Sequence, residues 1–130
     1  MNALQRMLDT NAVRALVEGR SPQLDRWFAE QRCALSAIVA AEVRFGLERR
    51  VLKANLRQLI EAVLETMEVL PWTEACATRY GRLRAELERR GTPLSAMDLL
   101  IASHALNEGC ILVSADQAFA QVPELRLEAW

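Results

Sequence analysis

The chain has 130 residues, of which 52% are hydrophobic and 25% charged, so residues 1–130 are expected to form one domain with a core of its own. It contains no apolar run of about 18 residues and no long hydrophobic stretch at its start, which argues against a membrane span or export and makes the cytoplasm the expected location. The formal net charge of −1 does not by itself indicate a nucleic-acid-binding protein.

Short apolar runs alternate with longer segments of helical periodicity, and this alternation predicts an α/β domain with a mostly parallel sheet. Strands are predicted at residues 3–8, 33–36, 68–70, 110–113 and, at the sheet edge, 125–127. Helices are predicted at residues 12–18, 22–31, 37–50, 54–67, 74–90 and 95–108, followed by a short one that Asp116 opens. The helix at 95–108 is apolar on nearly every side and should therefore lie in the interior.

Several polar residues stand where these helices should begin. The predicted N-caps are Ser21, Ser36, Thr73 and Ser95, and Gly19 and Gly109 are expected to end two helices.

The cysteines and the histidine limit the chemistry available. Cys33, Cys76 and Cys110 lie far apart among apolar neighbours, without C-x-x-C spacing, and are expected to be buried reduced thiols. His104 is the only histidine, so we expect neither a Cys/His zinc cluster nor a Ser-His-Asp triad. Acid–base or metal chemistry should therefore depend on carboxylates.

All but one of the 16 basic residues are arginine. Guanidinium groups fork onto phosphates and stack on bases, which suits RNA binding, although codon bias in a GC-rich genome would give the same composition. The basic residues gather in two regions, Arg44, Arg49, Arg50, Lys53 and Arg57 in the first and Arg79, Arg82, Arg84, Arg89 and Arg90 in the second. A solvated helix face would look the same, so none is assigned to a site.

Four acidic residues occupy unusual positions in this pattern: Asp9, Glu42, Asp98 and Asp116. Asp9 and Asp116 follow predicted strands, and open α/β sheets bind ligands outside the carboxyl ends of their strands. Glu42 falls in an apolar stripe with Ile38 and Phe45, and Asp98 shares the face of an all-apolar helix.

Each of these acids also has an ordinary structural explanation. Asp9 can be a helix N-cap, and Glu42 can extend outwards at the edge of its stripe or pair with an arginine. Asp98 fits a capping box with Ser95, and Asp116 lies inside a Ser114–Gln117 box. Considered together, however, four converging carboxylates would repel one another, and Mg²⁺ or Mn²⁺ is the natural counter-charge for an all-oxygen set.

Four segments in this order resemble the PIN-domain ribonucleases, and within them the VapC-type toxins of bacterial toxin–antitoxin pairs. These segments are residues 7–11 (Met-Leu-Asp-Thr-Asn), 36–46 around Glu42, 93–106 around Asp98 and 111–116 (Ile-Leu-Val-Ser-Ala-Asp). The resemblance implies a PIN-like domain with a central parallel five-stranded sheet flanked by helices.

The resemblance also implies the site. Asp9, Glu42, Asp98 and, more loosely, Asp116 would bind Mg²⁺ or Mn²⁺ and carry catalysis, with Asn11 and Ser114 orienting the acids or a metal-bound water. Many members of the family have an asparagine pair where this chain has Ala115 and Asp116, which makes Asp116 the ligand that departs most from the pattern.

The implied function is a metal-dependent endoribonuclease that cuts tRNA or other structured RNA. By resemblance it would form a homodimer, and a cognate VapB-like antitoxin would hold it inactive by presenting an arginine to the carboxylates. Two alternatives remain: a PIN-domain nuclease of housekeeping RNA maturation, and a non-catalytic binding module whose acids are only helix caps. Growth arrest on expression would separate the first alternative from a toxin, and metal binding would exclude the second.

Overall fold

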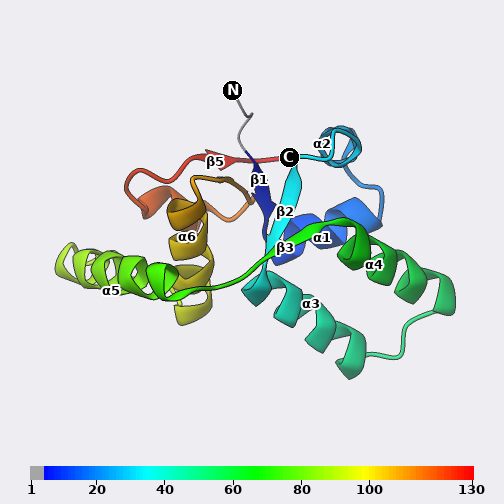
Figure 1. The fold of residues 1–130 in the computed structure, drawn as a ribbon, viewed down its shortest axis with the longest axis horizontal. Helices are drawn as coiled ribbons and strands as arrows, with labels where there is room; N and C mark the ends of the chain where they lie inside the picture. The colour runs from blue at the N-terminus through cyan, green and yellow to red at the C-terminus, as the bar shows by residue number, and fades with distance from the viewer. Residues whose placement is uncertain (1–4) are drawn as a thin grey trace.

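The computed structural model describes residues 5–130, which form a layered α/β domain (Figure 1). The strands are β1 (Arg6–Leu8), β2 (Cys33–Ser36), β3 (Glu68–Leu70), β4 (Ile111–Val113) and β5 (Leu127–Glu128). The helices are α1 (Thr10–Val17), α2 (Pro22–Ala29), α3 (Ala37–Arg49), α4 (Ala54–Thr66), α5 (Glu74–Arg89), α6 (Ala96–Glu108) and the 3₁₀ helix η1 (Gln117–Gln121). These elements agree closely with those predicted from the sequence.

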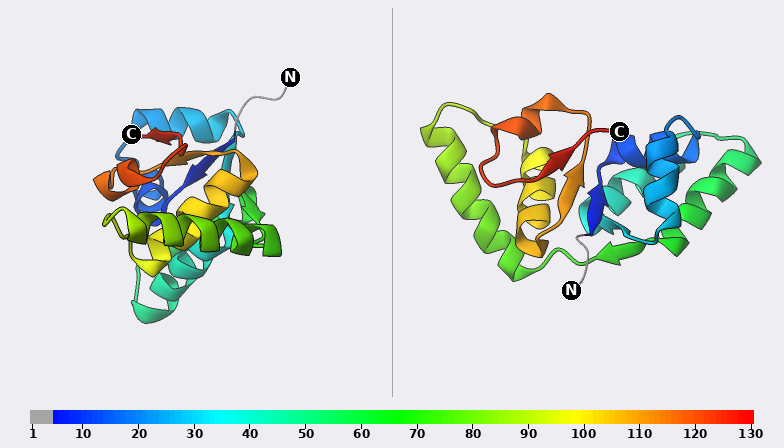
Figure 2. Two further views of the ribbon diagram at one scale, coloured as in Figure 1. Left: turned by 90° about the vertical axis from the view of Figure 1, so that its left-hand side faces the viewer. Right: turned by 90° about the horizontal axis from the view of Figure 1, so that it is seen from above.

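The five strands form one parallel sheet in the order β3-β2-β1-β4-β5, which confirms the predicted sheet. The chain runs outwards from β1 through β2 to β3 and then returns to β4 on the other side of β1. Helices α1, α2 and α4 cover one face of the sheet, and α5 and α6 cover the other (Figure 2). The order of connection therefore reverses between β1 and β4, and such a switch point opens a crevice at the carboxyl ends of the strands.

The core consists of the central strands and the helix faces packed on them. Met7 and Leu8 of β1, Leu35 of β2, and Leu112 and Val113 of β4 are fully buried. As predicted, α6 is buried on most of its sides, although Met97 in its first turn is 41% exposed and the end residues Ala96 and Glu108 are exposed as well. No helix of the described residues is both long enough and apolar enough to cross a membrane.

Helix starts follow from side-chain caps, most of which were predicted. The side chains of Ser21, Ser36, Thr73 and Ser95 each accept a hydrogen bond from a backbone N–H in the first turn of their helices. Helix α1 begins two residues earlier than predicted because Asp9 is its cap. Of the predicted first strand, residues 3 and 4 lie outside the described residues, and the last strand lies at Leu127–Glu128 rather than 125–127.

Helix α5 is attached to the domain mainly through α6. Cys76, Leu83 and Leu87 are buried along one face of α5, with half-buried Tyr80 between them, and this stripe packs on α6. The indole Nε1 of Trp72, just before α5, donates a hydrogen bond to the Leu100 carbonyl oxygen at 3.0 Å. Helix α5 lies at the outer side of the domain, away from α1–α4 (Figure 1).

Candidate active site

Asp9 lies at the switch point of the sheet, directly after β1. Its backbone N–H donates to the Val113 carbonyl oxygen at 3.1 Å, which ties it to the end of β4. Its side chain is the N-cap of α1, and Oδ1 accepts from the Ala12 N–H at 2.8 Å. The helix-cap interpretation of this residue is therefore confirmed, and its carboxylate is only 6% exposed directly after β1, while its role in a metal site stays a prediction.

Ser114 connects Asp9 with the segment after β4. Ser114 is buried, and its Oγ accepts a hydrogen bond from the Asp116 N–H at 3.0 Å. A hydrogen bond between the Ser114 and Asp9 side chains lowers the pKa of Asp9, so the hydroxyl favours the ionised acid. The role of Ser114 in orienting the acids stays a prediction.

Asp116 begins the last short helix as predicted, but in a different way from the predicted capping box. The expected Ser114–Gln117 box is wrong, since Asp116 is itself the N-cap of η1 and its Oδ1 accepts from the Ala118 N–H at 2.9 Å. The turn is a 3₁₀ helix, which begins two residues later than a box with Ser114 at the cap would require. Asp116 is exposed, unlike Asp9.

Asp98 lies in the first turn of α6, half-buried beside the same crevice. Its backbone N–H donates to Ser95 Oγ at 3.2 Å, which is one half of the predicted capping box. Burial raises the pKa of Asp98, and the charge of Asp116 raises it further, while a hydrogen bond with the Ser95 side chain opposes both effects.

The same electrostatics join Asp9 to this group. Burial is the largest cause that raises the pKa of Asp9, and the charges of Asp116 and Asp98 add to it, against the lowering effect of the Ser114 and Ala12 hydrogen bonds. Three carboxylates from the ends of β1 and β4 and from the start of α6 therefore lie within electrostatic reach of one another. In the described part of the chain, none of them forms an ion pair with a basic side chain.

Glu42 is held by Thr10, the residue after Asp9, to which the sequence assigned no role in the site. Thr10 Oγ1 donates to Glu42 Oε1 at 2.8 Å, which links the start of α1 to the middle of α3. The predicted stripe was wrong in detail: Phe45 is 61% exposed, and the buried side of α3 carries Val39 and Leu47 instead. Glu42 is half-buried at the boundary between the two faces.

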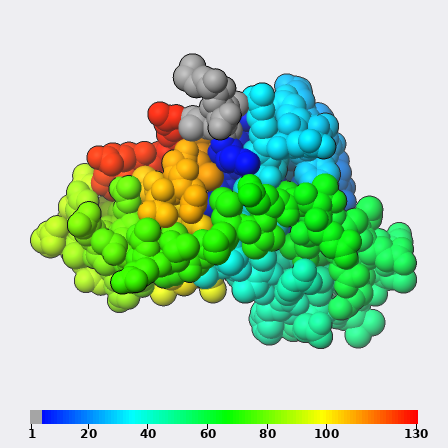
Figure 3. Space-filling model, in the orientation of Figure 1, coloured from blue at the N-terminus to red at the C-terminus, as the bar shows by residue number. Residues whose placement is uncertain are grey.

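The crevice lies between the helical layers. In Figure 1, α3 and the first turn of α6 lie on the same lower side of the sheet, and the lower edge of the molecule is notched between the α5–α6 and α3–α4 lobes (Figure 3). Asn11 is exposed in the first turn of α1. Its implied role in orienting the acids therefore stays a prediction.

The donor set suits a hard divalent cation. All four side chains offer carboxylate oxygens, which Mg²⁺ and Mn²⁺ prefer, and uncompensated charge on Asp9, Asp98 and Asp116 favours a cation. The four acids do not form a compact cluster of ligand atoms, however. Among residues 5–130, the one group of three ligand atoms within 4.8 Å of one another belongs to Cys76, His104 and Glu108.

This second group corrects the expectation that cysteine and histidine would not cluster. Cys76 and His104 lie on different helices, and only the packing of α5 on α6 brings them together. The cysteines are otherwise as predicted, since all three are buried free thiols.

Three of the clustered arginines are held in ion pairs on helix surfaces. Arg57 pairs with Glu48 and Glu61, and Arg84 pairs with Glu88. Arg90 pairs with Glu86. These three residues behave as the solvated-face explanation predicts. In residues 5–130, no ion pair is found for Arg44, Arg49, Arg50, Arg79, Arg82 or Arg89.

An apolar groove adjoins the acidic residues on the side of α1, α3 and α4. Its apolar lining includes Val13, Val17, Val43, Leu47, Leu56 and Ile60, and charged lining is supplied by Arg14, Glu18, Arg49 and Arg50. Thr10 lines the groove as well and also holds Glu42, so the groove leads towards the carboxylates.

Comparison with known proteins agrees with this geometry. A family model described as PIN domain matches residues 6–125. Ribonuclease VapC2 of Rickettsia felis is 33% identical over 129 residues, which cover 95% of this chain and 96% of that protein. The tRNA(fMet)-specific endonuclease VapC of Salmonella typhimurium is 30% identical over 130 residues, which cover 98% of both chains. In the crystal structure of VapBC2 from Rickettsia felis bound to a DNA fragment from their promoter, a chain with 30% identity matches 98% of this chain and 99% of its own length with a TM-score of 0.87.

Proposed function

Because this chain belongs to the PIN-domain family and, within it, to the VapC ribonucleases, we propose that it is a divalent-metal-dependent endoribonuclease that cleaves structured RNA as the toxin of a toxin–antitoxin pair. The observation that carries the metal dependence is the mutual repulsion of Asp9, Asp98 and Asp116 at the switch point of the sheet. Carboxylates of this kind, without a basic partner, are stabilised by a cation and serve to hold one.

The proposed site uses Asp9 and Asp98 as the central ligands, with Glu42 and Asp116 completing it. When bound, Mg²⁺ or Mn²⁺ would supply Lewis-acid activation of the scissile phosphate and of a water molecule. The Ser114 hydrogen bond lowers the pKa of Asp9 against the stronger effect of burial, and Thr10 holds one carboxylate oxygen of Glu42 by a hydrogen bond. These two hydroxyls therefore pre-orient the acids.

The substrate class we propose is tRNA. It rests on the Salmonella typhimurium relative, whose name states that it is a tRNA(fMet)-specific endonuclease. The arginines without ion pairs, such as Arg44 of α3 and Arg82 of α5, are the candidates for phosphate contacts, since the crevice lies between the lobes that carry them.

The partner we propose is a VapB-like antitoxin, as in the related VapBC2 complex. An apolar segment of it would lie in the groove between α1, α3 and α4, and an adjoining arginine would reach Glu42 and Asp9 past Thr10. We also propose that the toxin forms a homodimer, which light scattering on the purified protein would test.

Cleavage of total tRNA by the purified protein tests the enzymatic proposal. Activity should require Mg²⁺ or Mn²⁺, disappear in EDTA, and fall roughly 100-fold or more in Asp9→Asn and Asp98→Asn, as expected for loss of a catalytic group. Asp25→Asn is the matched control, because Asp25 is an exposed aspartate in the first turn of another helix, α2, and its loss should leave the rate unchanged. Cleavage that persists in EDTA or in the Asp98→Asn protein would refute the metal site.

Expression in a bacterial host tests the role as a toxin. Growth should stop on induction of the wild type and continue with Asp98→Asn, and co-expression of the antitoxin from the neighbouring reading frame should restore growth. Cleavage in vitro without growth arrest would instead indicate a housekeeping nuclease of the same fold.

A further inference from the structure

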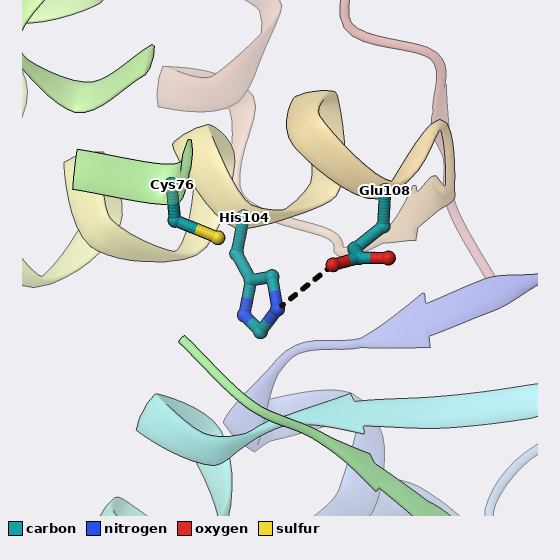
Figure 4. A group of neighbouring side chains, drawn as sticks. All are labelled: Cys76, His104 and Glu108. Atoms are coloured by element: carbon teal, nitrogen blue, oxygen red, sulfur yellow. Dashed lines mark ion pairs between the residues drawn. The ribbon is translucent and has the colours of Figure 1, made fainter. Parts of the chain in front are cut away.

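We propose a second metal site, for a borderline-soft divalent cation such as Zn²⁺, formed by Cys76 of α5 and by His104 and Glu108 of α6 (Figure 4). It lies apart from the carboxylates of the active site and would bind the cation through sulfur, nitrogen and oxygen. Its role would be to fasten α5 to α6.

The three side chains already lie near the separations that one ion requires. Their ligand atoms are within 4.8 Å of one another, and His104 Nε2 is 3.9 Å from Glu108 Oε1. Tetrahedral zinc with bonds of about 2.0–2.3 Å would place its ligands about 3.4–3.7 Å apart. A contraction of at most about 1.4 Å between ligand atoms would therefore close the site around an ion.

The Nε2 atom of His104 lacks a hydrogen-bond partner in the described residues. His104 is fully buried, yet this atom has no hydrogen-bond partner in the described chain. Its side chain is directed towards the Glu108 carboxylate (Figure 4), but 3.9 Å is too long for a hydrogen bond. A buried polar atom without a partner is costly, and a metal bond at Nε2 would satisfy it.

The other ring nitrogen is held in a way that suits metal binding. Nδ1 lies 2.7 Å from Ser36 Oγ, and a serine hydroxyl can accept as well as donate. When Nδ1–H donates to Ser36, the Nε2 lone pair is left free on the side of Glu108 (Figure 4), and a metal-bound histidine has the same kind of supporting hydrogen bond at its other ring nitrogen. Burial lowers the pKa of His104, against the Glu108 carboxylate and the Pro71 carbonyl, so the ring favours its neutral, metal-binding form.

The remaining ligands decide the class of metal. A cysteine sulfur and an imidazole nitrogen select Zn²⁺ or Co²⁺ over Mg²⁺ or Mn²⁺. Thr73 Oγ1 lies 3.5 Å from Cys76 Sγ and supports the thiolate, while Glu108, whose side chain is 33% exposed, borders solvent and leaves room for a water as the fourth ligand. Because α5 packs mainly on α6, an ion shared between the two helices would stabilise the attachment of α5 to the domain.

Titration with Co²⁺ tests the site directly, because a cysteine thiolate bound to Co²⁺ gives a charge-transfer absorption that carboxylates do not give. The Asp9→Asn, Asp98→Asn protein serves as the parent, so that the active-site acids do not compete. We expect a thiolate band that saturates at one equivalent of Co²⁺ and is displaced by Zn²⁺. Cys76→Ser should remove the band, and Cys33→Ser, the matched control at another buried cysteine, should retain it.

Thermal unfolding gives a second measurement of metal binding that does not depend on Cys76→Ser, a substitution at a buried residue. Zn²⁺ should raise the Tm of the parent and of Cys33→Ser, and Glu108→Gln should weaken Zn²⁺ binding at least tenfold, since this partly exposed side chain can be changed without disturbing the core. The proposal is overturned if the folded parent shows no thiolate band, if Cys76→Ser retains it, or if Glu108→Gln binds Zn²⁺ as tightly as the parent. None of these measurements uses cleavage activity, so their outcome tests the zinc site independently of the proposed nuclease function.

Discussion

At the scale of single residues, Asp9 combines two roles that conflict electrostatically. As a cap it accepts the Ala12 N–H, which stabilises its charge, but burial and the nearby Asp116 and Asp98 charges destabilise that charge. The second effect is the stronger one, because the pKa of Asp9 lies above its ordinary value. The folded protein therefore maintains this acid at a loss of stability, which is typical of a site kept for function.

The raised pKa of Asp9 predicts how metal-free stability depends on pH. Between the ordinary pKa of 3.8 and the higher value in the fold, the folded protein binds more protons than the unfolded chain, so the free energy of unfolding falls as the pH rises through this window. Asp9→Asn keeps the cap oxygen without the charge. In EDTA it should be more stable than the wild type at neutral pH, and the difference should vanish below about pH 3.8, as measured by urea unfolding across the pH range.

Bound metal should make the wild type more stable than Asp9→Asn, the reverse of the order expected in EDTA. Mn²⁺ at about 100 times its Kd would stabilise the wild type by about 2.7 kcal/mol and leave Asp9→Asn unchanged. Asp25→Asn should follow the wild type under both conditions, because Asp25 is exposed and distant in sequence from the four acids. A wild type that is at least as stable as Asp9→Asn in EDTA at neutral pH would contradict the electrostatic account of this residue.

At the scale of elements, the end of α6 places β4 and hence Ser114. Gly109 ends the helix with φ of +67°, and the Cys110 N–H bonds back to the Ala105 carbonyl oxygen at 2.9 Å, so the chain turns directly into β4. Nothing lies within 4 Å of the position that a Cβ would take at Gly109. Any cost of a side chain there is therefore backbone strain alone.

Two glycine substitutions should have opposite effects for this reason. Gly109→Ala should lower the free energy of unfolding by about 1 kcal/mol, because an L-residue is strained at positive φ. Gly81→Ala should raise it by about 0.5–1 kcal/mol, because Gly81 lies inside α5, where alanine favours the helix and the Cβ meets nothing. Each kcal/mol corresponds to roughly 4 °C in Tm, which calorimetry resolves. Shifts of the same sign would show that packing, not backbone conformation, controls these positions.

At the scale of the whole molecule, the two helical layers have separate tasks. Helices α1, α3 and α4 form the apolar groove beside Glu42, while α5 and α6 carry Asp98 and the proposed zinc site. The sheet between them joins both sides, because Asp9 and Ser114 lie on adjacent strands at its mouth. A partner bound in the groove would therefore act on the proposed catalytic acids without entering the α5–α6 layer.

The groove predicts which apolar residues of α4 contact the antitoxin. Leu56→Glu, which places a charge in the groove lining, should weaken binding of the antitoxin from the neighbouring reading frame at least about tenfold, the range of an interface anchor. Leu59→Glu is the matched control, since Leu59 is on the same helix, is 52% exposed and lies outside the lining. Calorimetric titration measures both affinities, and tRNA cleavage by the free variants should be unchanged. Equal losses from the two substitutions would place the antitoxin elsewhere.

The sequence by itself determined the elements, their order and the acids at the strand ends. Strand runs, helix periods and caps such as those at Ser21, Ser36 and Ser95 depend on contacts within a few residues, and these are readable along the chain. The five-stranded parallel sheet followed from the alternation of these elements together with the family resemblance.

Tertiary structure alone decided which distant side chains meet. Thr10 holds Glu42 because α1 packs against α3, and Phe45 stays exposed because α3 turns its Val39 and Leu47 side inwards. Cys76 reaches His104 only through the packing of α5 on α6. A helical period defines a face but not the neighbour that covers it, since packing between separate elements sets that neighbour. For this reason the candidate acids and Ser114 could be proposed from the sequence, whereas the contact of Thr10 with Glu42 and the cysteine–histidine group could not.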